Sequence, residues 1–374
     1  MNIKKADIEE QLRDATIEDY DESVDLLCFI YEVKNQSEKY VIQTIVKDVL
    51  EHKESLSNTY RRRKEILNTL KQLKLPEQRS PEWYEMRKEK LTASSLGTAI
   101  DKCHFQSREE LLLSKIEDTP YLPNPITEWG VKYEDVAIQF YEELNNVKIL
   151  DFGLVPHPSF EAFGASPDGI CDDTGNDPFV ARMVEIKCPP KRKFTKSVPH
   201  HYWMQVQGQL EVCDLDECDF LQVKIEEYEN YEEYQKDIFE IDGILQNGRT
   251  MLNYPKGVTI TYKNNEKLSY HYCKLNQSDK ELHEWIASSD QTNIHEIKWW
   301  KITRYENTLV VRDKQWWSEN VEKILLFYND LLSYKDNPVK VQQLKDTISQ
   351  QKKRKRKEEP KPLDPFQLLS DEEP

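Results

Sequence analysis

The sequence has few of the features that mark secreted, membrane or zinc-bound proteins. Its 374 residues hold no apolar run near the length of about 18 residues that a membrane span needs. The first stretch, MNIKKADIEEQLRDATIEDYDES, has no apolar core, so we expect no signal peptide. The seven cysteines form no CxxC pair, which argues against a zinc ribbon or a disulfide framework. We expect a reduced intracellular protein that does not enter membranes.

Glycine is scarce as well, with 10 residues in the chain and none before residue 76. Residues 1–75 instead place apolar side chains at spacings of three and four, which predicts helices that end at Pro76. With 38% hydrophobic residues, the whole chain can build one large domain or two smaller ones. The helical segment could serve as a regulatory cap, a partner-docking module or an oligomer contact, and the sequence does not choose among these.

Helical and strand-like patterns alternate after residue 76. The patterns predict a capped helix from residue 80, a second short helix near Thr92 or Ser94, and helices over 129–144, 201–213, 280–288 and 314–334. Short β-rich segments lie between 147 and 188, a strand covers 218–228, and residues 295–313 suggest a pair of strands. This order favours an α/β or α+β core with a mixed sheet. From about residue 350 the chain is polar and charge-blocked, which predicts disorder.

The net charge of −16 argues mildly against nucleic-acid binding, because phosphates favour basic surfaces. Basic residues are nevertheless concentrated in three places: RRRK at 61–64, KKRKRK at 352–357 and the stretch 187–196. Local patches matter more than the total charge. KKRKRK is either a nuclear-import signal, a non-specific DNA contact or a solvated charge run, so we expect the nucleus, or a viral factory in the cytoplasm, as the location.

The stretch VEIKCPPKRKFTK, residues 184–196, places a carboxylate and an ammonium two residues apart. On a strand, Glu185 and Lys187 face one side, with Val184 and Ile186 on the other. The pair is either an ordinary ion pair or half of an active site. Phosphodiester hydrolysis requires carboxylates that bind a divalent cation and a lysine near the attacking water. Asp168, in ASPDGI, is a turn residue or a further ligand for such a site.

Five segments together resemble one nuclease family. SPDG followed by EIKCP looks like the PD-(D/E)XK signature, and its context is similar to the lambda-exonuclease branch, the YqaJ-like viral recombinases. The other segments that carry the resemblance are EWYEMRKEKLTAS at 82–94, WG..YE at 129–134, YWMQVQGQL at 202–210 and VVRDKQWWSENVEKILLFY at 310–328. The resemblance covers roughly residues 80–330. It implies a restriction-endonuclease-like core over 77–335, preceded by the helical extension 1–76 and followed by a helix end and disordered tail over 336–374.

The resemblance also implies roles for individual residues. Asp168 and Glu185 would bind Mg²⁺ or Mn²⁺, with Glu134 and the backbone carbonyl of Ile186 assisting. Lys187 would be the catalytic lysine, and Gln205 would orient the water or the metal's surroundings. Arg87 and Ser94 would bind a 5′-terminal phosphate, while Lys191, Arg192 and Lys193 would face the DNA backbone. The plain alternatives are a helix-surface charge for Arg87, an N-cap for Ser94 and an exposed helix residue for Gln205.

The sequence therefore predicts a metal-dependent DNA exonuclease that attacks duplex ends, by resemblance in the 5′→3′ direction, in recombination, repair or viral DNA processing. A strand-annealing protein and a homo-oligomer are the implied partners besides duplex ends. Two alternatives are a structure-specific endonuclease of the same fold and a non-catalytic DNA-end binder. Glycoside hydrolysis by a carboxylate pair would leave Lys187 and Arg87 without a role.

Overall fold

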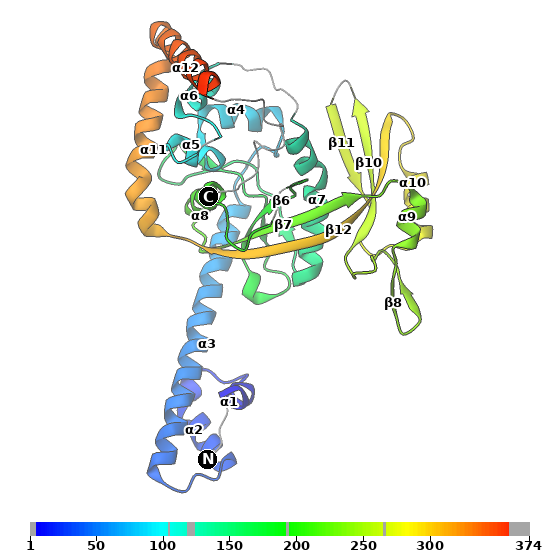
Figure 1. Ribbon diagram of the computed structural model, residues 1–374. Helices are drawn as coiled ribbons and strands as arrows, with labels where there is room; N and C mark the ends of the chain where they lie inside the picture. The colour runs from blue at the N-terminus through cyan, green and yellow to red at the C-terminus, as the bar shows by residue number, and fades with distance from the viewer. Residues whose placement is uncertain (1–4, 104, 118–123, 192–193, 265–266, 359–374) are drawn as a thin grey trace. The chain divides into compact units, whose positions relative to one another are not determined.

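The computed structural model describes residues 5–103, 105–117, 124–191, 194–264 and 267–358, and the chain divides into two compact units, 1–71 and 72–374 (Figure 1). The first unit consists of three helices: α1 (Lys5–Gln11), α2 (Tyr20–Ile30) and α3 (Gln36–Lys71). Apolar residues at helical spacing, among them Ile8, Leu27 and Val46, form its core. None of the helices within the described ranges is long and apolar enough to cross a membrane.

The second unit is built on a mixed seven-stranded sheet. Its strands, in spatial order, are β11 (Lys267–Tyr272), β10 (Lys256–Asn264), β12 (Ile294–Val311), β7 (Glu217–Glu227), β6 (Met183–Lys187), β5 (Gly169–Cys171) and β2 (Ile149–Leu150). Neighbouring strands are antiparallel except for β6 and β7, which run parallel with Glu185 beside Phe220. The predicted mixed sheet with flanking helices is confirmed.

Two helices lie on opposite faces of β6. Helix α7 (Pro125–Asn145) packs Tyr133 and Phe140 into an apolar core that includes Val184 and Ile186 of β6. Helix α8 (His200–Cys213) lies on the other side, close to a small sheet of β1 (Leu91–Thr92), β4 (Phe163–Ala165) and β3 (Val155–Pro156). Strand alternation therefore directs alternate residues of β6 toward α7 and α8.

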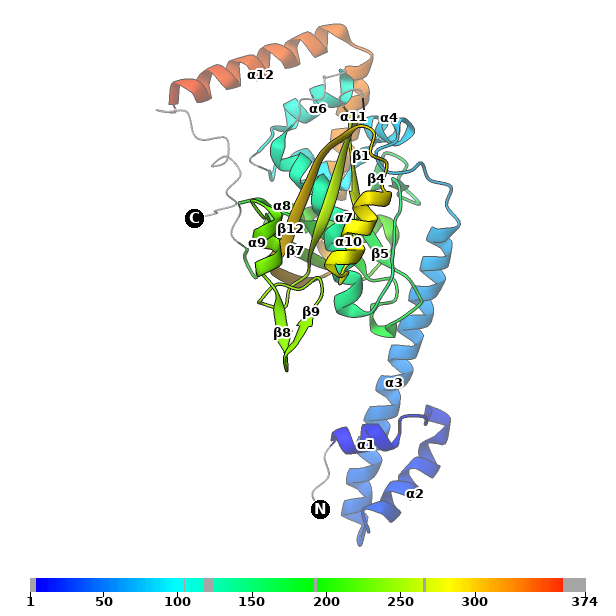
Figure 2. The ribbon, with the colours of Figure 1, turned by 90° about the vertical axis from the view of Figure 1, so that its right-hand side faces the viewer.

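Further helices pack on the small sheet and on one another. They are α4 (Pro81–Glu89), α5 (Leu96–Ala99), α6 (Arg108–Ile116), α11 (Lys314–Lys335) and α12 (Pro338–Glu358). Helices α6, α11 and α12 pack together, as Figure 2 shows. The remaining elements are α9 (Tyr231–Lys236), α10 (Asp279–Ser288) and the hairpin of β8 (Phe239–Ile241) and β9 (Ile244–Gln246).

Two predicted elements differ from the structure. Residues 295–313 do not form a pair of strands, because β12 runs unbroken from Ile294 to Val311 with an irregularity between Ile302 and Arg304. The pairing of this strand passes from β10 to β7 near its middle, and the stretch has no glycine or proline to turn the chain.

The second difference concerns the C-terminal segment. The stretch 350–358 is helical rather than disordered, because α12 buries Leu344 and Ile348 and Lys352 forms an ion pair with Glu110 of α6. The side chains of 354–358 and all of 359–374 lie outside the described residues.

Candidate active site

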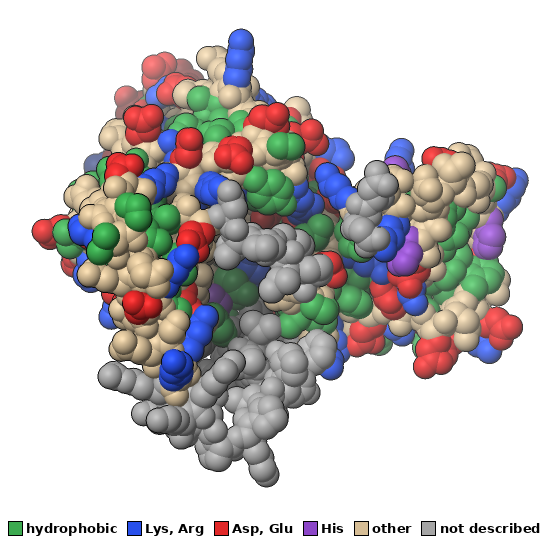
Figure 3. Space-filling view, turned by 90° about the horizontal axis from the view of Figure 1, so that it is seen from above, with side chains coloured by type: hydrophobic (Ala, Val, Ile, Leu, Met, Phe, Trp, Pro, Cys, Tyr) green, Lys and Arg blue, Asp and Glu red, His purple; other side chains and the backbone are tan. Residues whose placement is uncertain are grey.

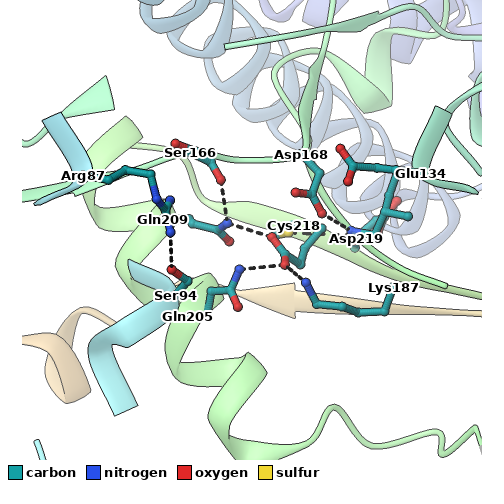
Figure 4. A network of polar contacts seen from close by, with 12 residues as sticks. Arg87, Ser94, Glu134, Ser166, Asp168, Lys187, Gln205, Gln209, Cys218 and Asp219 are labelled. Carbon is teal, nitrogen blue, oxygen red and sulfur yellow. Dashed lines mark hydrogen bonds and ion pairs between the residues drawn. The ribbon is translucent and has the colours of Figure 1, made fainter. Parts of the chain in front are cut away.

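Asp168 lies in the turn between β4 and β5, and its side chain points to β6. Its Oδ2 accepts a hydrogen bond of 2.7 Å from the backbone N–H of Ile186 (Figure 4). The next residue must be a glycine, because a Cβ at position 169 would lie 2.2 Å from Cγ2 of Ile149. The Pro-Asp-Gly sequence thus both turns the chain and fixes a carboxylate against the strand that carries Glu185.

Glu185 is fully buried and forms hydrogen bonds through both carboxylate oxygens. Its Oε1 accepts from Lys187 and, at 2.7 Å, from Nε2 of Gln205, and its Oε2 accepts at 2.7 Å from Nε2 of Gln209 (Figure 4). A buried carboxylate is tolerated only when such donors and a counter-charge replace water. The prediction that Glu185 and Lys187 share a face is confirmed.

Lys187 is held as an ammonium between carboxylates. Its Nζ pairs with Glu185 and lies 5.0 Å from the ring centre of Tyr202. Burial alone would lower the pKa of Lys187, but the charges of Glu185 and Asp168 outweigh burial and raise it. The residue can therefore donate a hydrogen bond or stabilise negative charge at neutral pH.

Glu134 extends from α7 toward Asp168, as Figure 4 shows. Its Oε2 accepts a hydrogen bond of 2.8 Å from Arg79, which precedes the N-cap Ser80 of α4. Burial raises the pKa of Glu134, and the charge of Arg79 opposes that rise. Helix α7 is thus the third element to bring a carboxylate to the site.

The electrostatics of the three carboxylates Glu134, Asp168 and Glu185 favour a bound cation. Burial, followed by the charge of Glu185, raises the pKa of Asp168 well above its ordinary value, although Lys187 partly compensates. The side-chain amide oxygen of Gln209, Oε1, is also buried without a partner among the described residues. Hard oxygen donors of this kind suit Mg²⁺ or Mn²⁺.

The carboxylates do not form a ready-made metal cage. Within the described ranges, no three His, Cys, Asp or Glu side chains are grouped closely enough to hold a metal. Glu185 is engaged by Lys187, and Glu134 by Arg79. The donor types fit a divalent cation, and the metal roles of Glu134, Asp168, Glu185 and the Ile186 carbonyl stay predictions.

Arg87 and Ser94 form a second group, on α4 and in the short 3₁₀ turn before α5. An Nη of Arg87 donates to Oγ of Ser94 at 3.2 Å, and the guanidinium lies 4.4 Å from the ring centre of Trp83. Oγ of Ser94 also lies 3.2 Å from that of Thr92. Ser94 is not an N-cap, and Arg87 is partly buried with its guanidinium held by Ser94 and Trp83, so neither plain alternative describes these residues. The phosphate-binding role stays a prediction.

The basic stretch after Cys188 is only partly within the described residues. Lys191 is exposed, whereas Arg192 and Lys193 lie outside the described ranges. Figure 3 shows Lys and Arg side chains mixed with Asp and Glu over the face seen from above, so no large basic patch dominates the described surface there. The predicted DNA contacts of Lys191, Arg192 and Lys193 are therefore untested.

Three residues of the site were not identified from the sequence. Arg79 pairs with Glu134, Gln209 binds Glu185, and Oγ of Ser166 accepts a hydrogen bond of 3.0 Å from the Trp83 indole. Gln209 could have been found, because it lies four residues after Gln205 on the predicted helix. Arg79 gave no such signal, since it reaches Glu134 only through the fold.

Comparisons with known proteins find a likeness to one domain family. Residues 82–216 match the model of the YqaJ-like viral recombinase domain. Over 320 residues the chain is 31% identical to the uncharacterized protein R354 of Acanthamoeba polyphaga mimivirus, an alignment that covers 76% of this chain. The chain spans only 58% of the length of that relative.

Two solved structures show a distant likeness. An alkaline exonuclease (LHK-Exo) from Laribacter hongkongensis is 19% identical with a TM-score of 0.41, over 72% of this chain and 99% of that one. A phage-related exonuclease from Haemophilus somnus 129PT is 15% identical with a TM-score of 0.34, over 66% of this chain and 93% of that one.

Proposed function

We propose, from the match of residues 82–216 to the YqaJ-like viral recombinase domain, that the protein is a metal-dependent deoxyribonuclease that degrades duplex DNA from its ends. The observation that carries the proposal is the convergence of Asp168, Glu185 and Lys187 on one side of β6. Phosphodiester hydrolysis requires this combination of carboxylates and an ammonium.

The proposed cofactor is Mg²⁺ or Mn²⁺, held by Asp168, Glu185 and the Ile186 carbonyl with Glu134 assisting. When bound, it would lower the pKa of a water molecule and neutralise charge on the phosphate. Gln205 and Gln209 fix both oxygens of Glu185, so this carboxylate keeps one orientation. Lys187 would place its charged Nζ beside the attacked phosphate.

The second proposed element is recognition of the DNA end. The guanidinium of Arg87 is partly buried, contacts Ser94 and the Trp83 ring, and forms no ion pair with a carboxylate in the described part of the chain. A phosphate would satisfy it bidentately, with the Ser94 hydroxyl as an additional donor. Recognition of a 5′-terminal phosphate supports 5′→3′ polarity. A strand-annealing partner, an oligomeric state and a nuclear or viral-factory location stay predictions.

Digestion of a linear 5′-phosphorylated duplex beside a closed circle, with Mg²⁺ and separate labels on the 5′ and 3′ ends, tests the proposal. We expect nucleotides from the linear duplex only, with the 5′ label released first. Lys187→Ala should abolish the activity, and the control Lys224→Ala, which removes an exposed lysine paired with Glu226, should not.

Each other outcome identifies a different protein. Cleavage of the closed circle would replace the proposal with an endonuclease. Binding of the duplex with no digestion under Mg²⁺ or Mn²⁺ would indicate a non-catalytic end binder. Full activity in Lys187→Ala would refute the role assigned to this lysine.

A further inference from the structure

Lys115 of α6 is a buried lysine whose ammonium bonds to the backbone of α4. Only 9% of the residue is exposed. Its Nζ donates to the carbonyl oxygen of Arg87 and, at 2.9 Å, to that of Lys90. These carbonyls lie at the C-terminal end of α4, where a helix has no partners of its own for its last acceptors. The Lys115 ammonium is thus hydrogen-bonded to the backbone carbonyl of Arg87 itself.

No carboxylate compensates the charge of Lys115 within the described residues. The neighbouring charges that act on it are those of Arg87 on α4 and Lys335 on α11, both cationic. The charged residues Arg108, Glu110 and Glu117 near the ends of α6 pair instead with α11 and α12. Burial and the two cations lower the pKa of Lys115 to about 7.

Among the residues that the structure describes, Arg87 likewise forms no ion pair with a carboxylate. Its contacts are the Ser94 hydroxyl and the Trp83 ring, and burial lowers the pKa of its guanidinium. The Lys115 ammonium bonds to the backbone carbonyl of Arg87, and no described carboxylate acts on either cation, so an anion would stabilise both. Retaining such a pair costs stability, which points to a ligand that both charges serve.

We propose that Lys115 positions Arg87 for a 5′-terminal phosphate and couples binding of that phosphate to its own protonation. The inference rests on the proposed function and names a specificity determinant of that site. Lys115 bonds to the backbone and is a positioning residue, not a catalytic one. A bound phosphate favours the ammonium form, and by linkage the ammonium form favours the phosphate.

The coupling predicts an unusual pH dependence. Lys115 is charged below its pKa and neutral above it, so preference for a phosphorylated end should fall as pH rises through neutrality. The phosphate itself gains charge as pH rises past about 6. The substrate alone would therefore change the preference in the opposite direction.

The test compares full-length protein on linear duplexes that differ only in a 5′-phosphate or a 5′-hydroxyl, as the ratio of kcat/KM from pH 6.5 to 8.5 with Mg²⁺. For the unaltered protein we expect the ratio to fall at least fivefold over this range. Lys115→Gln, which keeps a donor without the charge, should lower the ratio about fivefold or more at pH 6.5 and abolish its fall with rising pH, which leaves only the small rise that the phosphate itself produces. Digestion of the hydroxyl end should stay within about twofold.

Two further variants complete the design. Lys115→Met removes donor and charge together and should lower the ratio at least as much as Lys115→Gln. Lys90→Met is the matched control, because the Lys90 ammonium bonds to the carbonyl of Glu161 and not to that of Arg87. It should leave the ratio and its pH dependence unchanged.

The failures are distinguishable. If the unaltered protein digests neither end, the proposed function fails. If it digests both ends with a ratio that is constant with pH, or that survives Lys115→Gln, the inference is overturned and the nuclease assignment stands. Equal losses on both ends in both Lys115 variants would mean that Lys115 only supports the fold, which also overturns the inference.

Discussion

The guanidinium of Arg79 lies 2.8 Å from a carboxylate oxygen of Glu134, so the carboxylate predicted to assist the metal already has a cation beside it. Arg79 has a left-handed backbone with φ of 66°, directly before the N-cap of α4. The pair connects the start of α4, which carries Arg87, to the helix that faces Asp168. Arg79 and a divalent cation would therefore compete for the same carboxylate.

This competition predicts opposite effects of two substitutions on metal affinity. Arg79→Gln removes a repelling charge and should tighten Mn²⁺ binding about threefold to tenfold, since about 1 kcal/mol is involved. Glu134→Gln removes a ligand charge and should weaken binding by at least as much. Calorimetric titration with Mn²⁺ measures both without relying on activity. Equal affinities in the two variants would place the metal away from Glu134.

Asp168 should make the metal-free protein less stable as pH rises. Its pKa is raised in the folded state, so above the unfolded value, near 3.8, ionisation opposes folding, and this cost grows up to the folded pKa. Asp168→Asn keeps an oxygen for the Ile186 N–H and removes the charge. We expect the variant to be more stable than the unaltered protein at pH 8, and to be inactive.

The measurement is urea unfolding of both proteins in EDTA at pH 4.5 and pH 8. Only the difference between the two proteins is assigned to Asp168, because other groups titrate in both. A variant less stable than the unaltered protein at pH 8 would show that the Ile186 hydrogen bond to the charged carboxylate outweighs burial and repulsion.

The strand and helix patterns predicted much of this site. The alternation of Glu185 and Lys187 with Val184 and Ile186 follows from the pleat of a strand, and the helix that carries Gln205 follows from its spacing. The partners of these residues depend on long-range packing: Arg79 meets Glu134 across 55 positions of sequence. Such contacts have no local pattern, so propensity and periodicity could not indicate them.

At Gly208, α8 packs closely against β4 and the segment around Ser94. A Cβ at this position would lie 3.0 Å from Cδ2 of Leu96, 3.1 Å from Cζ of Phe163 and 3.2 Å from Cβ of Ala93. Gly208→Val should destabilise the protein by about 2–4 kcal/mol through overpacking and shift Gln205 and Gln209 from Glu185. Thermal unfolding measures the loss.

Gly130 supplies a control in the form of a helical glycine with open space around it. It lies within α7, and a Cβ there would meet nothing within 4 Å. Gly130→Ala should stabilise the protein by about 0.5–1 kcal/mol, because alanine loses less backbone entropy in a helix. A similar loss of stability in both variants would mean that the close approach of α8 is not the cause.

Helix α12 offers a sharp contrast between sequence and structure, because the polar, basic composition from about residue 350 suggested disorder in its second half. Two apolar residues one helical turn apart, Leu344 and Ile348, are buried, while Val339 of the same helix is 67% exposed. If α12 packs as the structure shows, Leu344→Ala and Ile348→Ala should each cost about 2–4 kcal/mol of stability. Val339→Ala should cost less than about 0.5 kcal/mol.

Chemical denaturation of the three variants decides between a packed and a detached helix. A detached helix would make all three substitutions equally silent, because none would remove buried surface. A packed helix would also protect the backbone amides near Leu344 from hydrogen exchange, and Leu344→Ala should reduce that protection. Since α12 is joined to α6 by the Lys345–Glu117 and Lys352–Glu110 pairs, a packed result would establish it as support for the helix that carries Lys115.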